Sequence, residues 1–182
     1  MFCSSTVSRD SRSFGASTRL DATDTILVTK ARRAQPREAL GGALVRGPYT
    51  ELYVHLVWAT WDRLPWLTPD ITGRVYAAIA DRCRLLRCDP IAIGGIADHV
   101  HALVRLHPSV DVAKLVKEVK GSSSHLVTHA LRPEQPFKWQ GAYGAFTVAK
   151  KHVPAVTHYI EAQSLHHADS TLWEEAEKCS SE

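Results

Sequence analysis

The stretch P-I-A-I-G-G-I-A-D-H-V-H-A-L-V-R-L, residues 90–106, contains two apolar runs, 90–96 and 99–106, which only Ala97 and Asp98 separate. Short runs that are rich in β-branched residues and bounded by turn residues predict β-strands. Because only two residues connect them, the strands are expected to be antiparallel neighbours. The chain is therefore predicted to contain an antiparallel sheet.

The flanking sequence adds a strand and two helices to this pair. Residues 51–60 (ELYVHLVWAT) are rich in β-branched and aromatic residues, which predicts a buried strand. Residues 68–86 and 111–131 have apolar side chains at helical spacing, which predicts two amphipathic helices. Glycine and serine at 121–124 predict a kink or break in the second helix.

The last two predicted elements are a strand over residues 137–149 and a helix over residues 153–167. The complete order is β-α-β-β-α-β followed by a C-terminal helix. This is the order of the ferredoxin-like (RRM-like) α+β fold, in which two helices pack on one face of an antiparallel sheet. The opposite face is then expected to be free for a ligand.

The two ends of the chain differ in composition from the middle. Residues 1–48 are rich in Ser, Thr, Arg and Gly, with 8 basic and 4 acidic residues, which predicts a disordered extension. Residues 169–182 have 1 basic and 5 acidic residues and are expected to form an acidic tail. Residues 49–168, with 13 basic and 10 acidic residues, are predicted to be the one globular domain. The net charge of +3 therefore averages a basic body with an acidic end.

The cysteines and the apolar stretches indicate the environment of the protein. The 4 cysteines are too few and too irregularly spaced for a disulfide framework, which predicts a reducing, cytoplasmic location. No apolar stretch approaches the ~20 residues that a bilayer-crossing helix needs, so no membrane partner is expected.

His99 and His101 stand two residues apart in the predicted strand 99–106. Successive side chains of a strand point to opposite faces, so these two share a face and Val100 points away from them. Two neighbouring imidazoles make half of a metal site. An isolated H-x-H pair is more often a pair of surface histidines, so the motif alone assigns no function.

Tyr159 and Gln163 lie four residues apart in the predicted final helix and are therefore neighbours on one helix face. A tyrosine hydroxyl has a pKa near ~10 and is a poor nucleophile unless a base or a cation stabilises the phenolate. A metal ion beside Tyr159 would supply that charge. Without one, Tyr159 is an ordinary helix aromatic with a satisfied hydroxyl.

Four sequence blocks together resemble a known family. They are D-H-V-H at 98–101 after G-G-I, K-G-S-S-S at 120–124, W-Q-G-A-Y-G-A-F-T-V at 139–148, and Y-I-E-A-Q-x-x-H-H at 159–167. Their order and content resemble the single-tyrosine HUH transposases, which include the insertion-sequence-200-like enzymes and the REP-associated transposases. The resemblance covers residues 49–168, which it identifies as a transposase catalytic domain.

The resemblance implies both the chemistry and the partner. It makes Tyr159 the nucleophile and His99, His101 and Gln163 the ligands of a divalent cation, Mg²⁺ or Mn²⁺. Attack by Tyr159 would leave a 5′-phosphotyrosine and a free 3′-hydroxyl on single-stranded DNA folded as a palindromic hairpin. Because the helix with Tyr159 can pack on its own sheet or on that of a second copy, a homodimer is a further expectation.

Six other residues are candidates for contacting DNA, because cationic side chains neutralise phosphates and aromatic rings contact bases. These residues are Arg63, Arg105, Lys114, Lys117, Lys120 and Tyr143. The three lysines follow an i, i+3, i+6 spacing that gathers them along one helix side, which is equally typical of a solvated face.

Two other functions are compatible with the sequence. One is a non-catalytic, domesticated DNA- or RNA-binding module of the same fold. The other is a metal-dependent phosphodiesterase that uses water as its nucleophile. Covalent capture of DNA distinguishes the transposase from both.

Overall fold

The computed structural model describes residues 27–28 and 49–179. Five strands form one antiparallel sheet in the order β1-β3-β4-β2-β5, with the bounds β1 Leu27–Val28, β2 Tyr53–Ala59, β3 Asp89–Ile96, β4 His99–Arg105 and β5 Gly144–Val148. The helices of the described residues are α1 Pro69–Leu85, α2 Val112–Leu126, α3 Val153–Glu161 and α4 Gln163–Asp169. Short helical turns occupy Trp61–Arg63, Val127–Leu131, Lys150–His152 and Glu174–Glu177.

The predicted ferredoxin-like α+β fold is confirmed. The elements follow in the order β2-α1-β3-β4-α2-β5, and β4 lies between β3 and β2 in the sheet. The predicted extension 1–48 lies outside the described residues, except that Leu27–Val28 pairs with β3 at the sheet edge. None of the described helices has the length and apolar character needed to span a bilayer.

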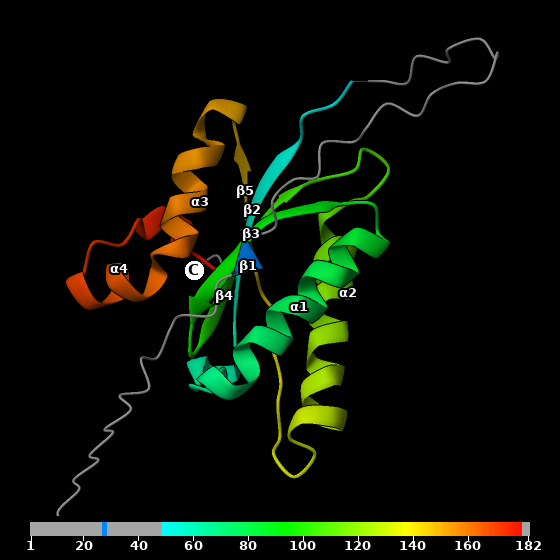
Figure 1. Ribbon diagram of the computed structural model, residues 1–182, viewed down its shortest axis with the longest axis vertical. Coiled ribbons are helices and arrows are strands. Elements are labelled where there is room, and N and C mark those ends of the chain that lie inside the picture. The colour runs from blue at the N-terminus through cyan, green and yellow to red at the C-terminus, as the bar shows by residue number, and fades with distance from the viewer. Residues whose placement is uncertain (1–26, 29–48, 180–182) are drawn as a thin grey trace, which may run out of the picture.

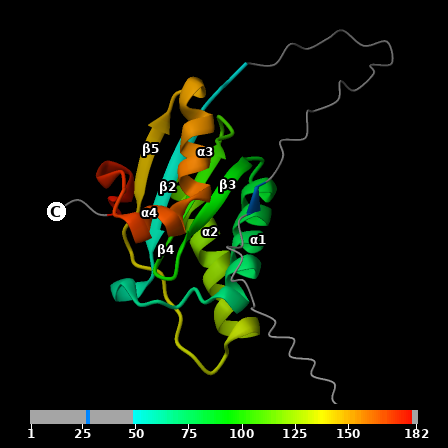
Figure 2. The ribbon, with the colours of Figure 1, turned by 60° about the vertical axis from the view of Figure 1, so that its left-hand side comes forward.

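Helices cover both faces of the sheet (Figures 1 and 2). On one face, α1 and α2 enclose the main apolar core. On the other, α3 packs on β3 and β4. This second face was expected to be free, and that expectation is wrong, because Val156 and Ile160 of α3 are apolar and bury against Ala92 and Leu103. The last described residues approach the same face beside α3 (Figure 2).

α2 does not kink as predicted. It runs unbroken through Gly121 to Leu126. The serines that follow Gly121 donate to carbonyls of the preceding helical turn, as in the 2.6 Å bond from Ser123 Oγ to the carbonyl of Val119. Their hydroxyls are thus satisfied within the helix and do not compete with its backbone.

Two predicted elements are shorter than expected. The strand predicted over 137–149 is limited to β5, and upstream of it Trp139 makes only an isolated bridge to Thr60. The helix predicted over 153–167 is divided into α3 and α4 at Ala162, whose backbone angles of φ −101° and ψ 18° leave the helical range. The division places Tyr159 on α3 and Gln163 on α4.

Candidate active site

His99 and His101 lie side by side on the face of β4 that α3 covers, and both are 0% exposed. The strand register places Ala59 and Val57 of β2 opposite them. Val100, between the two histidines, points into the core on the α1 and α2 side, as strand alternation predicts. The sheet thus fixes two imidazoles in a buried position.

Asp98 orients His99. The Nδ1 atom of His99 lies 2.6 Å from Asp98 Oδ1, and because a carboxylate only accepts, Nδ1 donates. Burial would raise the pKa of Asp98, but the hydrogen bond from His99 and the charge of Arg63 hold it below its usual value. The Nε2 atom of a neutral His99 then carries a lone pair, and it lies 3.3 Å from Gln163 Oε1.

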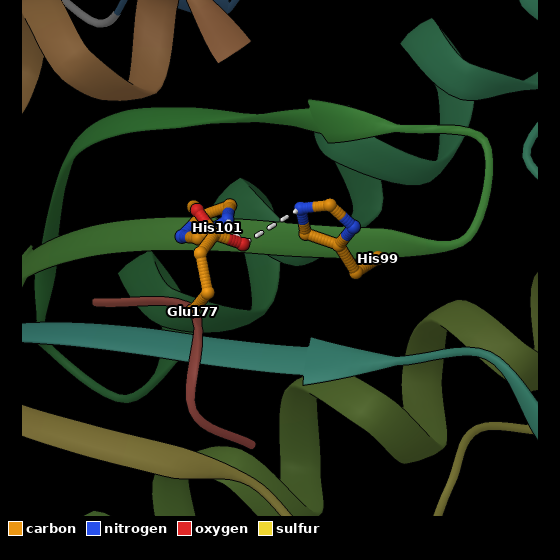
Figure 3. Close-up of side chains that lie close together, drawn as sticks. All are labelled: His99, His101 and Glu177. Carbon is orange, nitrogen blue, oxygen red and sulfur yellow. Dashed lines mark ion pairs between the residues drawn. The ribbon is translucent and has the colours of Figure 1, made fainter. Parts of the chain in front are cut away.

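Glu177 completes the cluster, although it lies outside the predicted domain 49–168 and belongs to the expected acidic tail. Its Oε2 atom is 3.4 Å from His99 Nε2 and 3.3 Å from His101 Nε2 (Figure 3). Burial would raise the pKa of Glu177, but the contacts with His101 and Tyr159 lower it to about 2. Burial lowers the pKa of His101 to about 4, against the opposing effect of Glu177. A charged carboxylate therefore faces neutral His101.

This donor set fits a divalent cation. Ligand atoms of His99, His101 and Glu177 all lie within 4.8 Å of one another. The lone pairs of His99 Nε2, Gln163 Oε1 and Glu177 Oε2 converge, and Nε2 of His101 is buried without a hydrogen-bond partner among the described residues. Acceptors that converge without donors repel one another, and a cation removes that repulsion. The amide and carboxylate oxygens are ligands that both Mg²⁺ and Mn²⁺ accept, whereas the two imidazole nitrogens suit Mn²⁺ better than Mg²⁺, which prefers oxygen.

Tyr159 meets the same cluster from α3 but is only 1% exposed. Its hydroxyl donates to Glu177 Oε1 and lies 3.3 Å from the backbone N–H of Trp173, from which it accepts. The ring of Trp173 stacks on the Tyr159 ring at 4.3 Å with 3° between the planes. Burial and the contact with Glu177 raise the pKa of Tyr159 to about 12. Trp173 and Glu177 therefore cover the Tyr159 hydroxyl.

Two glycines allow the backbone to approach the sheet closely here. A Cβ added at Gly94 of β3 would overlap the carbonyl oxygen of Ile160, which follows Tyr159 on α3. A Cβ added at Gly144 of β5 would overlap the carbonyl oxygen of Lys178, which follows Glu177. Glycine at these positions therefore lets both Tyr159 and Glu177 come within reach of the histidines.

Only one of the basic DNA-contact candidates lies beside this cluster. Arg63 forms an ion pair with Asp98 at 3.3 Å, and its Nη2 lies 3.4 Å from Cys179 Sγ. Arg105, at the other end of β4, forms an ion pair with Asp89. The structure therefore separates two arginines that the sequence placed in one group.

The remaining candidates lie on the α2 side of the molecule. Lys114 and Lys117 are exposed on α2, across the sheet from the histidines. Lys120 is half-buried and donates to the backbone carbonyl of Gln140, so it fixes the loop before β5. Tyr143 precedes β5 and packs against the core under α1 and α2. None of these four side chains joins the cluster of His99.

Sequence reasoning missed Glu177 and a third buried histidine, His55. Glu177 stands in an acidic run with no periodicity, so no sequence signal distinguished it. His55 was detectable as a polar residue in the middle of an otherwise apolar predicted strand. It is 3% exposed and shares a hydrogen bond with His101.

The chain matches known proteins over the region that carries His99, His101, Tyr159 and Gln163. A sequence model of the family described as "Transposase IS200 like" matches residues 48–163. A crystal structure from Deinococcus radiodurans R1, assigned as a transposase, is 27% identical with a TM-score of 0.54 and covers 65% of this chain and 95% of that chain. The structure of a REP-associated tyrosine transposase bound to a REP hairpin is 17% identical with a TM-score of 0.52, which is a likeness of fold, and covers 67% of this chain and 72% of that chain. No curated protein matches the chain.

Proposed function

The chain belongs to the IS200-like transposase family, and we propose that this DNA transposase cleaves and rejoins single-stranded DNA through a covalent bond to Tyr159. One observation carries the proposal. Within one chain, the Tyr159 hydroxyl and the converging nitrogen and oxygen atoms of His99, His101 and Gln163 surround a single carboxylate, that of Glu177. Phosphoryl transfer requires a nucleophile and a cation that both contact the same phosphate, and here the Tyr159 hydroxyl and the cation site both contact the same carboxylate.

His99, His101 and Gln163 would hold the divalent cation, Mg²⁺ or Mn²⁺. When bound, the cation polarises the scissile phosphate and offsets the negative charge that develops on it. Asp98 keeps the proton of His99 on Nδ1, so that Nε2 remains available as a ligand. Burial under α3 excludes water from the site and strengthens each of these electrostatic contacts.

In the reaction, Tyr159 Oη attacks phosphorus, the bond from phosphorus to the 3′ oxygen breaks, and a 5′-phosphotyrosine forms. The proton leaves the tyrosine, and the departing 3′ oxygen gains one. Attack by another 3′-hydroxyl reverses these steps and joins a new strand. The energy of the broken bond is kept in the covalent link, so no nucleotide triphosphate is needed.

The Glu177 carboxylate occupies the position that the scissile phosphate would take. One of its oxygens accepts from the Tyr159 hydroxyl and the other faces the nitrogens of His99 and His101. A phosphate ready for attack needs the same neighbours. DNA and the segment around Glu177 therefore compete for the site, and the structure has the closed arrangement.

We expect the DNA partner to be a single strand folded as a hairpin. Among the basic candidates, Arg63 is placed to meet a phosphate beside the scissile one, because it adjoins Asp98 at the edge of the site. Arg105, Lys114 and Lys117 are exposed and remain candidates for contacts farther along the DNA. Lys120 and Tyr143 would first have to leave their contacts with the loop before β5 and with the core.

The direct test is covalent capture. A labelled single-stranded hairpin oligonucleotide, incubated with the full chain and Mn²⁺, should give a protein–DNA band that resists denaturant. Tyr159→Phe and EDTA should each abolish the band, and Tyr143→Phe should retain it. Loss of the band in Tyr143→Phe alone would contradict the assignment of the nucleophile. DNA binding that EDTA does not change, without a band, would indicate the non-catalytic module, and cleaved product without a band would indicate the phosphodiesterase.

A mixing experiment tests whether one chain is sufficient. Because Tyr159 lies beside His101 of its own chain, a mixture of His101→Ala and Tyr159→Phe should recover no capture. Recovered capture would instead show that two copies of a homodimer share the site.

A further inference from the structure

His55 lies on β2, on the same face of the sheet as the two histidines of β4. The register places it opposite Leu103, and it is therefore a diagonal neighbour of His101. Its side chain is 3% exposed in an otherwise apolar strand. A buried polar group in such a position requires a hydrogen-bond partner.

That partner is His101. The Nε2 atom of His55 lies 2.9 Å from Nδ1 of His101. The ring planes differ by 14°, and the centroids, at 5.1 Å, are farther apart than the nitrogens, so the two rings meet edge to edge. A hydrogen bond between two neutral imidazoles contains one proton, and the direction of donation decides which nitrogen of His101 is bare.

We infer that His55 is the positioning residue of His101: it accepts a hydrogen bond from His101 Nδ1 and thereby leaves the Nε2 lone pair directed at the cation. This inference rests on the proposed function. Donation in the opposite sense would place the His101 proton on Nε2 and block that nitrogen. Each histidine of β4 thus has its own acceptor, a carboxylate for His99 and a neutral imidazole for His101.

The surroundings of His55 allow this direction. His55 and Phe146 help to line a cavity of about 380 Å³ between β5 and the C-terminal segment. Water in this cavity can serve the second nitrogen of His55, so the proton of His55 can stay there and Nε2 can accept. Because the acceptor lies on β2 and the ligand on β4, the sheet register itself fixes the orientation of the His101 ring.

Direct Mn²⁺ binding tests the inference without reference to catalysis. Free Mn²⁺ would be measured by electron paramagnetic resonance during titration of the full-length wild type, His55→Phe and His55→Gln. His55→Phe keeps a ring but has no acceptor, so its Mn²⁺ affinity should fall about 10- to 100-fold, the usual effect of losing such a partner. His55→Gln retains an acceptor oxygen and should bind within about threefold of wild type.

Leu56→Ala is the matched control. Leu56 is the next residue of β2, is equally buried and points to the α1 and α2 side, so its loss should lower stability and leave Mn²⁺ affinity unchanged. Equal Mn²⁺ affinity of His55→Phe and wild type would overturn the inference about His55 but not the proposed metal site. Mn²⁺ binding that His101→Ala does not reduce would overturn the proposed metal site, and the inference with it.

A second measurement needs no variant at His55. Nitrogen-15 NMR of wild type saturated with Mg²⁺ reports which ring nitrogen of each histidine is protonated. The proton of His55 is expected on Nδ1 and that of His101 on Nδ1, with His55 Nε2 bare. A proton on His55 Nε2 would overturn the inference even if His55→Phe does not fold.

Discussion

Two backbone segments lie against the site face of the sheet, and each passes over a glycine. α3 brings the carbonyl of Ile160, the residue after Tyr159, over Gly94 of β3, and the segment 170–179 brings the carbonyl of Lys178, the residue after Glu177, over Gly144 of β5. One segment carries the proposed nucleophile, and the other carries the carboxylate that accepts a hydrogen bond from it. In both places glycine, which has no Cβ, allows the close backbone approach: of the helix with Tyr159 in one case and of the segment that covers Tyr159 in the other.

The segments differ in how they are anchored. Val156 and Ile160 of α3 bury in an apolar cluster with two strands. In the segment 170–179, Cys179 buries against β2, Trp173 is 46% exposed although one face of its ring stacks on Tyr159, and Glu177 makes polar contacts. Burial of a whole aliphatic side chain stabilises by about 1.5–3 kcal/mol, whereas a hydrogen bond contributes about 0.5–1.5 kcal/mol net. We infer from this difference that Tyr159 is held in place and that the segment 170–179, which covers it, is displaceable.

Gly94→Ala should change the rate of covalent capture most, because it displaces α3, which carries Tyr159. The new Cβ would overlap the carbonyl oxygen of Ile160 and push α3 away from β3. A displacement of about 1 Å at a reacting group can cost about 100-fold in rate, and overpacking typically costs about 1–3 kcal/mol of stability. We expect covalent capture to fall about 100-fold, measured as the initial rate of adduct formation.

Gly121→Ala is the control for this substitution. Nothing lies within 4 Å of a Cβ at Gly121, which is in the interior of α2. The change should leave capture unchanged and stabilise the chain by about 0.5–1 kcal/mol. Capture by Gly94→Ala at the wild-type rate would show that α3 does not need its close approach.

Without a metal, a falling pH should reduce the free energy of unfolding first through the histidines of the sheet and only later through Glu177. Burial lowers the pKa of His55 to about 3 and that of His101 to about 4, so the unfolded chain binds more protons below pH 6.5. Stability from these histidines is present above pH 6.5 and is lost as the pH falls toward 4. Glu177, whose pKa is lowered from 4.5 to about 2, retains its contribution until the pH falls below 4.5.

Urea unfolding in EDTA measures this order. The free energy of unfolding should drop by about 4 kcal/mol between pH 7 and pH 5, because His55 and His101 each lose about 1.4 kcal/mol for every pH unit below pH 6.5. Glu177→Gln should show the same drop, because its carboxylate does not titrate in that range. A flat profile from pH 7 to pH 5 in the wild type would contradict the assignment of neutral, buried histidines.

The contrast between α3 and the segment 170–179 also explains which parts of the site could be predicted from the sequence. Strand alternation placed His99 and His101 on one face, and the apolar runs predicted the order of strands and helices along the chain, because both depend on local periodicity. Glu177 reaches the site through a backbone approach at Gly144, 33 residues earlier in the chain, and no local pattern encodes such a contact. The division of the last helix at Ala162 is likewise not predicted by helix propensity, because alanine is the strongest helix former.

Gly144→Ala should raise the capture rate, in contrast to Gly94→Ala, because it displaces the segment 170–179 that covers Tyr159. The new Cβ would overlap the carbonyl oxygen of Lys178 and weaken closure over the site. If about 1.4 kcal/mol of closure is lost, the open population and the capture rate rise about tenfold. Glu177→Gln should also raise capture, because it removes the anion that competes with phosphate. A decrease in capture in both variants would mean that Glu177 assists the reaction.

Trp173→Ala should give the smallest increase. Trp173 stacks on Tyr159 and covers the face of its ring, but it is nearly half exposed, so the pair contributes about 0.5–1.5 kcal/mol to closure. We expect capture to rise about threefold, with little change in unfolding free energy, because the core beneath α3 is untouched. Trp61→Ala is the matched control, since Trp61 is 41% exposed and packs under Lys138, away from Tyr159. If both variants raise capture equally, the increase results from removing any exposed tryptophan, and the stacking of Trp173 does not limit access to Tyr159.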